Sequence, residues 1–162
     1  MDNNAYAQFK AGKDFDEAGF WERVTEIQER ELSPEFIVIP DAPFSKEGTI
    51  EMANRVAKRI ADNSLGADAM PWYLALQDGM TKAEVRAIFE NIESQGGIVS
   101  GLFLGGSNKF KIAEGKKWAD FAHDDLDVPL HFARAGTPDK LALAIEIGAD
   151  MIDSTGPIRD QD

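Results

Sequence analysis

The sequence contains no cysteine and only two histidines, His123 and His131. A chain without cysteine forms no disulfide, no thiolate metal site and no cysteine nucleophile, and two histidines are too few for a zinc site built on histidine. A bound metal would need carboxylate ligands. We expect no bound metal, and we expect no cofactor.

Long hydrophobic runs are also missing. No stretch approaches the roughly 18 to 20 uninterrupted apolar residues of a membrane span. The first residues, Met1–Asn4, do not have the basic and then apolar layout of a secretory signal. These absences predict a cytoplasmic protein without a membrane partner.

Positive charge is scarce, because 17 Lys and Arg face 29 Asp and Glu and the formal net charge is -12. An acidic chain repels phosphate backbones, which disfavours nonspecific binding of nucleic acid unless basic residues gather on one face. Lys109, Lys111, Lys116 and Lys117 lie close together in the chain. We interpret this group as a solvated helix face, and a basic patch as the alternative.

What is present is a regular alternation of strand-like and helical segments. The length of 162 residues and the apolar fraction of 43% predict one globular domain over residues 1–162. Apolar runs of strand length cover Phe36–Ile39, Trp72–Leu76, Ile98–Leu104, Val128–Phe132 and Ala149–Ile152. Apolar positions at helical spacing lie between them, at Phe20, Val24 and Ile27, at Ile50, Ala53, Ala57 and Ile60, and at Val85, Ile88, Phe89 and Ile92.

Two helix starts are marked by capping residues. Thr81 and Glu84 have the spacing of a capping box, and Thr137-Pro138-Asp139 offers a cap, a first-turn proline and an acid at the positive end of the helix dipole. Short buried strands that alternate with helices predict a parallel sheet with right-handed crossovers. Trp21, Trp72 and Trp118 are predicted to pack in its core.

An open doubly wound sheet and a (β/α) barrel both fit this alternation, and the strand ends favour the barrel. Polar residues or glycines follow nearly every apolar run, and a closed barrel would bring them to one mouth. A full barrel has eight strands and about 250 residues. We therefore predict an α/β, TIM-barrel-like repeat of parallel strands that forms an incomplete barrel.

The residues after these strands are the candidates for chemistry. Asp41 and Asp153 would face each other across the mouth, where two carboxylates in different surroundings can divide the roles of nucleophile and general acid. Each could instead cap the following helix. His131, within an apolar run, is interpreted as a satisfied interior residue rather than a base.

Neutral and basic groups complete the candidate site. Gln77 offers a donor and an acceptor, and Gly105-Gly106 could present open backbone N–H groups to a base or a phosphate, or could only form a tight turn. Arg134 and Arg159 could bind a phosphate or a carboxylate, or could form loose surface ion pairs.

With these residues in view, the chain resembles the tRNA-guanine transglycosylase superfamily of TIM barrels, in particular short phage and bacterial members related to enzymes that place 7-deazaguanines in nucleic acid. The resemblance lies in Gly136-Thr137-Pro138, then Gly148-Ala149-Asp150, then Asp153 followed by Pro157 and Arg159, in the family's order and spacing. It extends over nearly the whole chain.

The resemblance implies a pentosyltransferase that replaces guanine by a 7-deazaguanine in nucleic acid. It gives Asp153 the role of the nucleophile that bonds to the ribose, and Asp2 the role of the acid/base aspartate. It assigns base recognition to Asp41, Gln77 and the Gly105-Gly106 pair, with Arg134 or Arg159 keeping Asp153 charged. The partners implied are guanine or a 7-deazaguanine and either DNA or tRNA.

The chain also departs from the family. The usual zinc site and the basic helical region that grips tRNA are absent, and Asp2 directly follows Met1. Two alternatives therefore remain: a non-catalytic base-binding partner subunit of such an enzyme, and a phosphate-binding barrel enzyme that acts on a small metabolite. An incomplete barrel would expose apolar faces, so we expect a homo-oligomer or a partner subunit.

Overall fold

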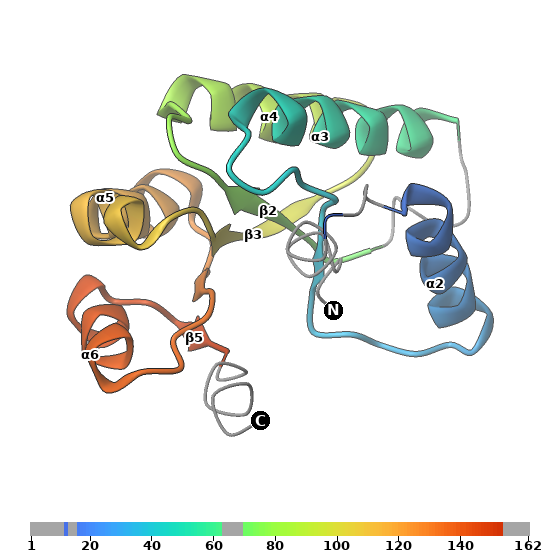
Figure 1. The fold of residues 1–162 in the computed structure, drawn as a ribbon. Helices are drawn as coiled ribbons and strands as arrows, with labels where there is room; N and C mark the ends of the chain where they lie inside the picture. The colour runs from blue at the N-terminus through green and yellow to red at the C-terminus, as the bar shows by residue number, and fades with distance from the viewer. Residues whose placement is uncertain (1–11, 13–15, 63–69, 154–162) are drawn as a thin grey trace.

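The structure is a computed structural model that describes residue 12, residues 16–62 and residues 70–153. Strands and helices alternate along the described chain, as shown in Figure 1. The elements are α2 (Glu17–Glu29), β1 (Ile37–Val38), α3 (Lys46–Ala61), β2 (Trp72–Leu76), α4 (Lys82–Ser94), β3 (Val99–Leu104), α5 (Asn108–Asp120), the π-helix η2 (Phe121–Leu126), β4 (Leu130–Phe132), α6 (Pro138–Ile147) and β5 (Met151–Ile152). None of the helices in these residues is both long and apolar enough to cross a membrane.

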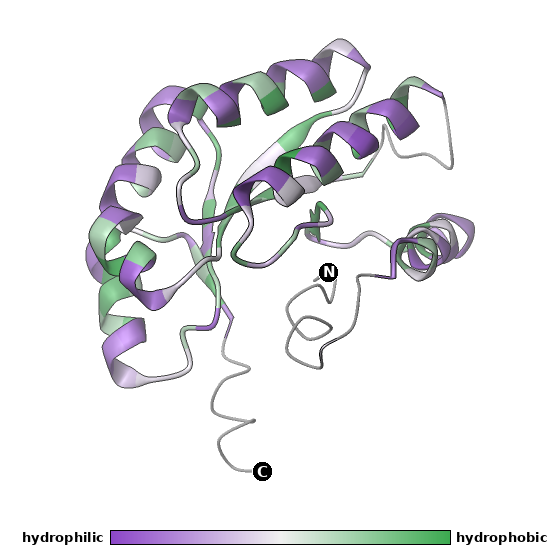
Figure 2. Cartoon of the chain, turned by 45° about the horizontal axis from the view of Figure 1, so that its top comes forward, coloured by the Kyte–Doolittle hydropathy of each residue, from purple (hydrophilic) through white to green (hydrophobic). Residues whose placement is uncertain are grey.

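The five strands form one parallel sheet in the order β1-β2-β3-β4-β5, which confirms the predicted parallel α/β architecture. Strand order follows chain order without the reversal that defines a doubly wound sheet. Successive right-handed crossovers therefore place the helices on the same side. The sheet is curled into a half-barrel with the helices around its outside (Figure 1, Figure 2).

Side chains at the first position before each helix explain where the helices begin. Thr81 and Glu84 form both hydrogen bonds of the predicted capping box, and Thr137 caps α6 ahead of Pro138. Ser45 and Ser107 cap α3 and α5 in the same way, although the sequence interpretation did not identify them. Each of these four caps sets a helix start at the carboxyl end of a strand.

The hydrophobic core fills the space between the sheet and the outer helices. The three tryptophans are at most 4% exposed, as predicted, and Trp72 lies against Phe20 and Trp21 of α2. Figure 2 shows hydrophobic residues alternating with hydrophilic ones along the helices, the pattern of helices with one buried face. Burial of this layer supplies the main favourable term of folding.

One lysine departs from the predicted solvated face. Lys109, Lys116 and Lys117 are exposed, but Lys111 is only 1% exposed, so the interpretation was wrong for this residue. The reason is helical periodicity, because Lys111, Gly115 and Trp118 share the face of α5 that packs on the sheet. Lys111 is therefore an internal amine in a mostly apolar layer.

The opposite, concave face of the sheet carries an aromatic cluster, defined as Phe36, Tyr73, Phe103 and His131. The His131 ring stacks on Phe103 at 4.9 Å, and Phe36 stacks on Tyr73 at 4.8 Å and contacts His131 at 5.1 Å. The pairing of β2 with β3 is irregular between Trp72 and Tyr73, and Tyr73 lies opposite Gly101. Gly101 leaves the space that the Tyr73 ring occupies.

Candidate functional site

The predicted site residues within the described chain follow the carboxyl ends of successive strands. Asp41 follows β1, Gln77 follows β2, Gly105 and Gly106 follow β3, Arg134 follows β4 and Asp153 follows β5. All five strands are parallel, so these residues lie along one edge of the half-barrel. Asp2 and Arg159, also predicted for the site, lie outside the described residues.

Gln77 is joined to Asp41 at this edge. Its amide Nε2 donates to Asp41 Oδ2 at 2.7 Å, and its Oε1 accepts the backbone N–H of Phe44 at 3.2 Å. Gln77 is only 2% exposed, whereas Asp41 is partly exposed. Gln77 therefore orients the Asp41 carboxylate and the loop after β1.

The Gly105-Gly106 turn lies beside Gln77 and Arg134. A Cβ on Gly105 would come within 3.9 Å of Gln77 Nε2, and the carbonyl of Gly106 accepts from the Arg134 guanidinium at 2.9 Å. The Gly105 N–H donates to the Phe103 carbonyl, so in this structure it is not the open amide that we predicted. Any ligand contact by a Gly105 N–H would require this turn to rearrange.

Gly106 also has a structural reason to be glycine. Its φ is +79°, and a Cβ there would come within 2.7 Å of Asp78 Oδ1. Asp78 accepts the backbone N–H of Ser107 at 2.9 Å and its hydroxyl at 2.6 Å. Asp78 thus fixes the turn before α5. The sequence did not predict this role, although Asp78 belongs to the polar segment that follows β2.

Asp153 is held by groups from β4 and the loop that follows it. The backbone N–H of Arg134 donates to Asp153 Oδ1 at 2.9 Å, and His131 Nε2 lies 3.3 Å from Oδ2. Burial acts to raise the pKa of Asp153, but the hydrogen bonds from His131 and Arg134 and their charges outweigh it and hold the pKa below its ordinary value. Asp153 is therefore ionised at neutral pH, and Arg134 contributes as predicted.

Lys111 of α5 contacts the same loop that holds Asp153. Its Nζ donates to the Ala133 carbonyl at 2.6 Å, and that carbonyl belongs to the peptide group whose N–H, on Arg134, donates to Asp153. An ammonium on the oxygen polarises the peptide and strengthens its N–H as a donor. Arg134 adopts a left-handed φ of +57°, which belongs to this tight loop.

His131 is buried as predicted, but it is not a fully satisfied interior residue. Its Nε2 faces Asp153, and its Nδ1 is buried and has no hydrogen-bond partner among the described residues. In a neutral ring whose Nε2–H donates to the carboxylate, Nδ1 is an acceptor on the concave face, whereas in a protonated ring Nδ1–H is a donor there. The apolar run around His131 predicted its burial, whereas its partner lies 22 positions away and no local pattern identifies it.

The geometry provides an ionised carboxylate, a buried amide that orients a second carboxylate, and an arginine, along one edge. In the part of the chain that the structure describes, no group of three histidine or acidic side chains could hold a metal ion. Carboxylate chemistry with hydrogen-bonding side chains is what this arrangement can perform. The sequence matches no family model, and no curated protein matches it.

Proposed function

We propose that this chain is a TIM-barrel-like base-exchange glycosyltransferase, similar to the tRNA-guanine transglycosylases, that replaces guanine by a 7-deazaguanine in nucleic acid. The observation that carries the proposal is the Asp153 carboxylate, which accepts the Arg134 N–H, has a lowered pKa and lies at the strand edge that also carries the Asp41–Gln77 pair. A nucleophilic carboxylate must be charged and held in place before it attacks.

In the proposed reaction an oxygen of Asp153 attacks C1′ of a guanosine unit. The bond from C1′ to the base nitrogen breaks, its electron pair leaves with the base, and a covalent ester to the sugar remains. The departing base accepts a proton as it leaves. The incoming 7-deazaguanine loses a proton from the matching nitrogen, attacks C1′ and releases the Asp153 carboxylate, so protons and bonds balance.

Asp41 is proposed to bind the base through its carboxylate. Guanine and 7-deazaguanine both present N–H donors on their pairing edge, and a carboxylate accepts such donors. Gln77 positions that carboxylate from a buried site. Gln77 is therefore proposed to act through Asp41 rather than on the base.

Trapping of the covalent intermediate tests the proposal. The chain is incubated with guanine-containing DNA or tRNA and a 7-deazaguanine, and denaturing electrophoresis should then show a protein band of higher mass. The band should disappear in Asp153→Ala. Asp150→Ala is the matched control, because Asp150 also accepts from a histidine and a backbone N–H, but before β5 rather than after it. A band that persists in Asp153→Ala would contradict the assignment.

The half-barrel favours one alternative, a base-binding partner subunit without catalysis. Ile145 of α6 and Ile152 of β5 are 72% and 42% exposed, and among the described residues β5 pairs only with β4. Exposed apolar side chains beside an open sheet edge suit association with a second copy or another subunit. Native mass measurement of the purified chain tests this, and a strictly monomeric particle would contradict it.

A further inference from the structure

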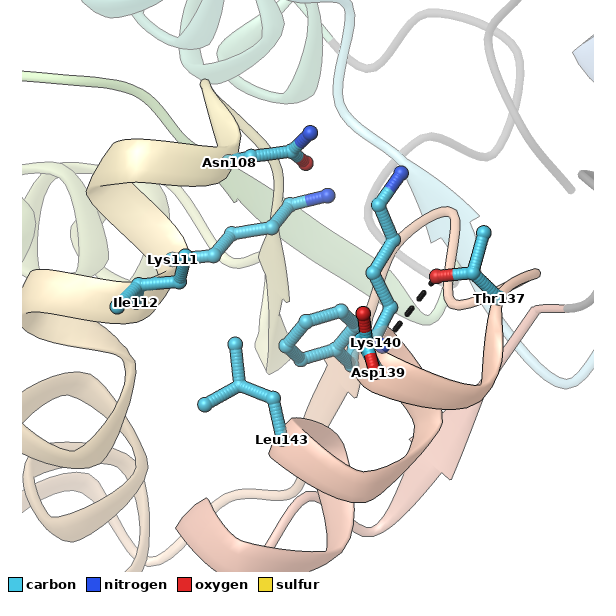
Figure 3. Close-up of a pocket in the computed structure, with 8 residues that line it drawn as sticks. Asn108, Lys111, Ile112, Thr137, Asp139, Lys140 and Leu143 are labelled. Atoms are coloured by element: carbon cyan, nitrogen blue, oxygen red, sulfur yellow. Dashed lines mark hydrogen bonds between the residues drawn. The ribbon is translucent and has the colours of Figure 1, made fainter.

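A cleft between α5 and α6 contains two lysines that the candidate site does not use to contact a substrate. Figure 3 shows Lys111 and Lys140 extending toward the same space from the two helices. The cleft has a volume of about 280 Å³. It is lined by Asn108, Lys111, Ile112, Phe132, Thr137, Asp139, Lys140 and Leu143.

Lys111 is a buried amine that forms no ion pair with a carboxylate of the described residues. Its Nζ has three donor hydrogens, of which one is used by the Ala133 carbonyl, and it lies 5.1 Å from the centre of the Phe132 ring. Among the described residues, no carboxylate forms an ion pair with Lys111 or with Lys140. An ammonium removed from water is costly unless it is paired, so an anion bound in the cleft would offset the cost of burying a charged Lys111.

Among the charges that act on Lys111, positive groups outnumber negative ones. Burial lowers the pKa of Lys111 to about 7, Arg134 and Lys140 act in the same direction, and Asp153 opposes them. An anion bound between the lysines would reverse this and keep Lys111 protonated. Asn108, at the start of α5, adds an amide donor to the rim, and Thr137 adds the cap of α6.

We propose that the cleft between α5 and α6 binds a phosphate group of a small organic ligand or a nucleotide. Lys111 and Lys140 would neutralise the oxygens, and Asn108 would donate to them. Phe132, Ile112 and Leu143 form an apolar wall for the part of the ligand that carries the phosphate. The volume is at the lower end for ligand sites, which suits one phosphate and a small attached group.

Asp139, the carboxylate that lines the cleft, would repel a bound anion. Its removal should therefore change the affinity in the opposite direction to removal of a lysine. Calorimetric titration with inorganic sulfate, whose charge is constant near neutrality, should show binding at pH 6.5. Lys111→Met and Lys140→Gln should each weaken it by about tenfold or more, as expected for a lost charged hydrogen bond. Asp139→Asn should strengthen it several-fold, because a repelling charge is removed.

Lys109→Gln is the matched control. Lys109 is exposed on the same helix, carries the same charge and does not line the cleft. Its removal should change the affinity by less than about twofold, since exposed charges at a distance are screened by salt. Absence of sulfate binding to the unmodified chain, or equal weakening by Lys109→Gln, would overturn the proposal.

The pH dependence gives a second readout. Sulfate affinity should be level below about pH 7 and should fall above it as Lys111 loses its proton. Within the described ranges, the charged groups that act on this lysine or line the cleft with it are Arg134, Lys140, Asp139 and Asp153. The fall should vanish in Lys111→Met, and a urea titration of that variant checks that it remains folded. An unchanged fall in folded Lys111→Met would contradict the role of Lys111.

Competition identifies the source of the phosphate. A nucleoside 5′-monophosphate offers a monoester, and a dinucleoside monophosphate offers the diester of a nucleic-acid backbone. Displacement of sulfate by the first alone indicates a free phosphorylated molecule, and displacement by the second indicates a nucleic-acid substrate. Displacement by neither would overturn the proposal. Asp153→Ala should still bind sulfate, so failure of base exchange and failure of this site are separable.

Discussion

Two histidine–aspartate pairs flank β5, and they differ in what surrounds them. His123 Nε2 lies 2.6 Å from Asp150, which also accepts the Leu130 N–H at 2.8 Å before the strand. His131 and Asp153 repeat the arrangement after the strand, with the Arg134 N–H as the backbone donor. We call these the entry pair and the exit pair.

The environment separates the two pairs more than their own geometry does. The entry pair is solvent-exposed, with side chains 36% and 41% exposed, and consists of a π-helix residue and a loop residue. In the exit pair the His131 side chain is 6% exposed and stacks on Phe103, and the Asp153 side chain is 28% exposed. Asp153 also interacts with the charges of Arg134 and Lys111. A hydrogen-bonded pair alone does not indicate a site; convergence with groups from other strands does.

A substitution in the aromatic cluster should perturb the exit pair and leave the entry pair unchanged. Gly101→Ala would place a methyl group against the Tyr73 ring, which also stacks on Phe36. Overpacking of this kind costs about 1–3 kcal/mol in the free energy of unfolding, measured by urea titration. Asp153 and His131 carbon chemical shifts should move, while those of Asp150 and His123 should not. Equal movement at both pairs would remove the distinction.

Loss of the buried Gln77 amide should give the next largest decrease in the free energy of unfolding. Gln77→Met removes both hydrogen bonds of a side chain that is 2% exposed and leaves Asp41 without that donor. We expect about 2 kcal/mol of destabilisation, from the cost of a lost hydrogen bond to a charged group. Asn91→Ala is the control, because this exposed amide bonds only Asn54 among the described residues. Its unfolding free energy should change by less than about 0.5 kcal/mol.

The pH dependence of the free energy of unfolding compares the two pairs directly, and we expect it to show the smallest of these changes. Burial acts to raise the pKa of Asp150, but its bonds to His123 and to Leu130 lower it, and the pKa of Asp153 is also lowered. Stability from a lowered carboxyl pKa is present above the ordinary value of 3.8 and is lost as pH falls through the folded-state pKa.

Asp150→Asn and Asp153→Asn should therefore each reduce stability at pH 6, by about 1 kcal/mol or less for the exposed entry pair. As pH falls below 3.8 and through the lowered pKa values of the two carboxyls, the variants should approach the unmodified chain, as followed by urea unfolding across this range. A difference that persists unchanged at low pH would show that packing, not charge, is responsible.

Much of the architecture was predictable because its causes are local. The capping box at Thr81 and the cap at Thr137 depend on residues within one helical turn, and both were predicted and found. The alternation of apolar runs and amphipathic stretches predicted five parallel strands. The strand lengths were less accurate: Ala149–Ile152 was expected where β5 covers Met151–Ile152. Strand ends depend on pairing with a neighbour, which the sequence does not display.

The sequence by itself determined the α/β alternation, the helix starts at Thr81 and Thr137 and the alignment of polar residues after the strands, since these follow from periodicity and short-range hydrogen bonding. Only the tertiary structure decided that Lys111 is buried, that Gln77 holds Asp41 and that His131 faces Asp153. Those contacts join residues 22 to 36 positions apart. Curvature of the sheet brings them together, and no local pattern encodes which side chains then meet.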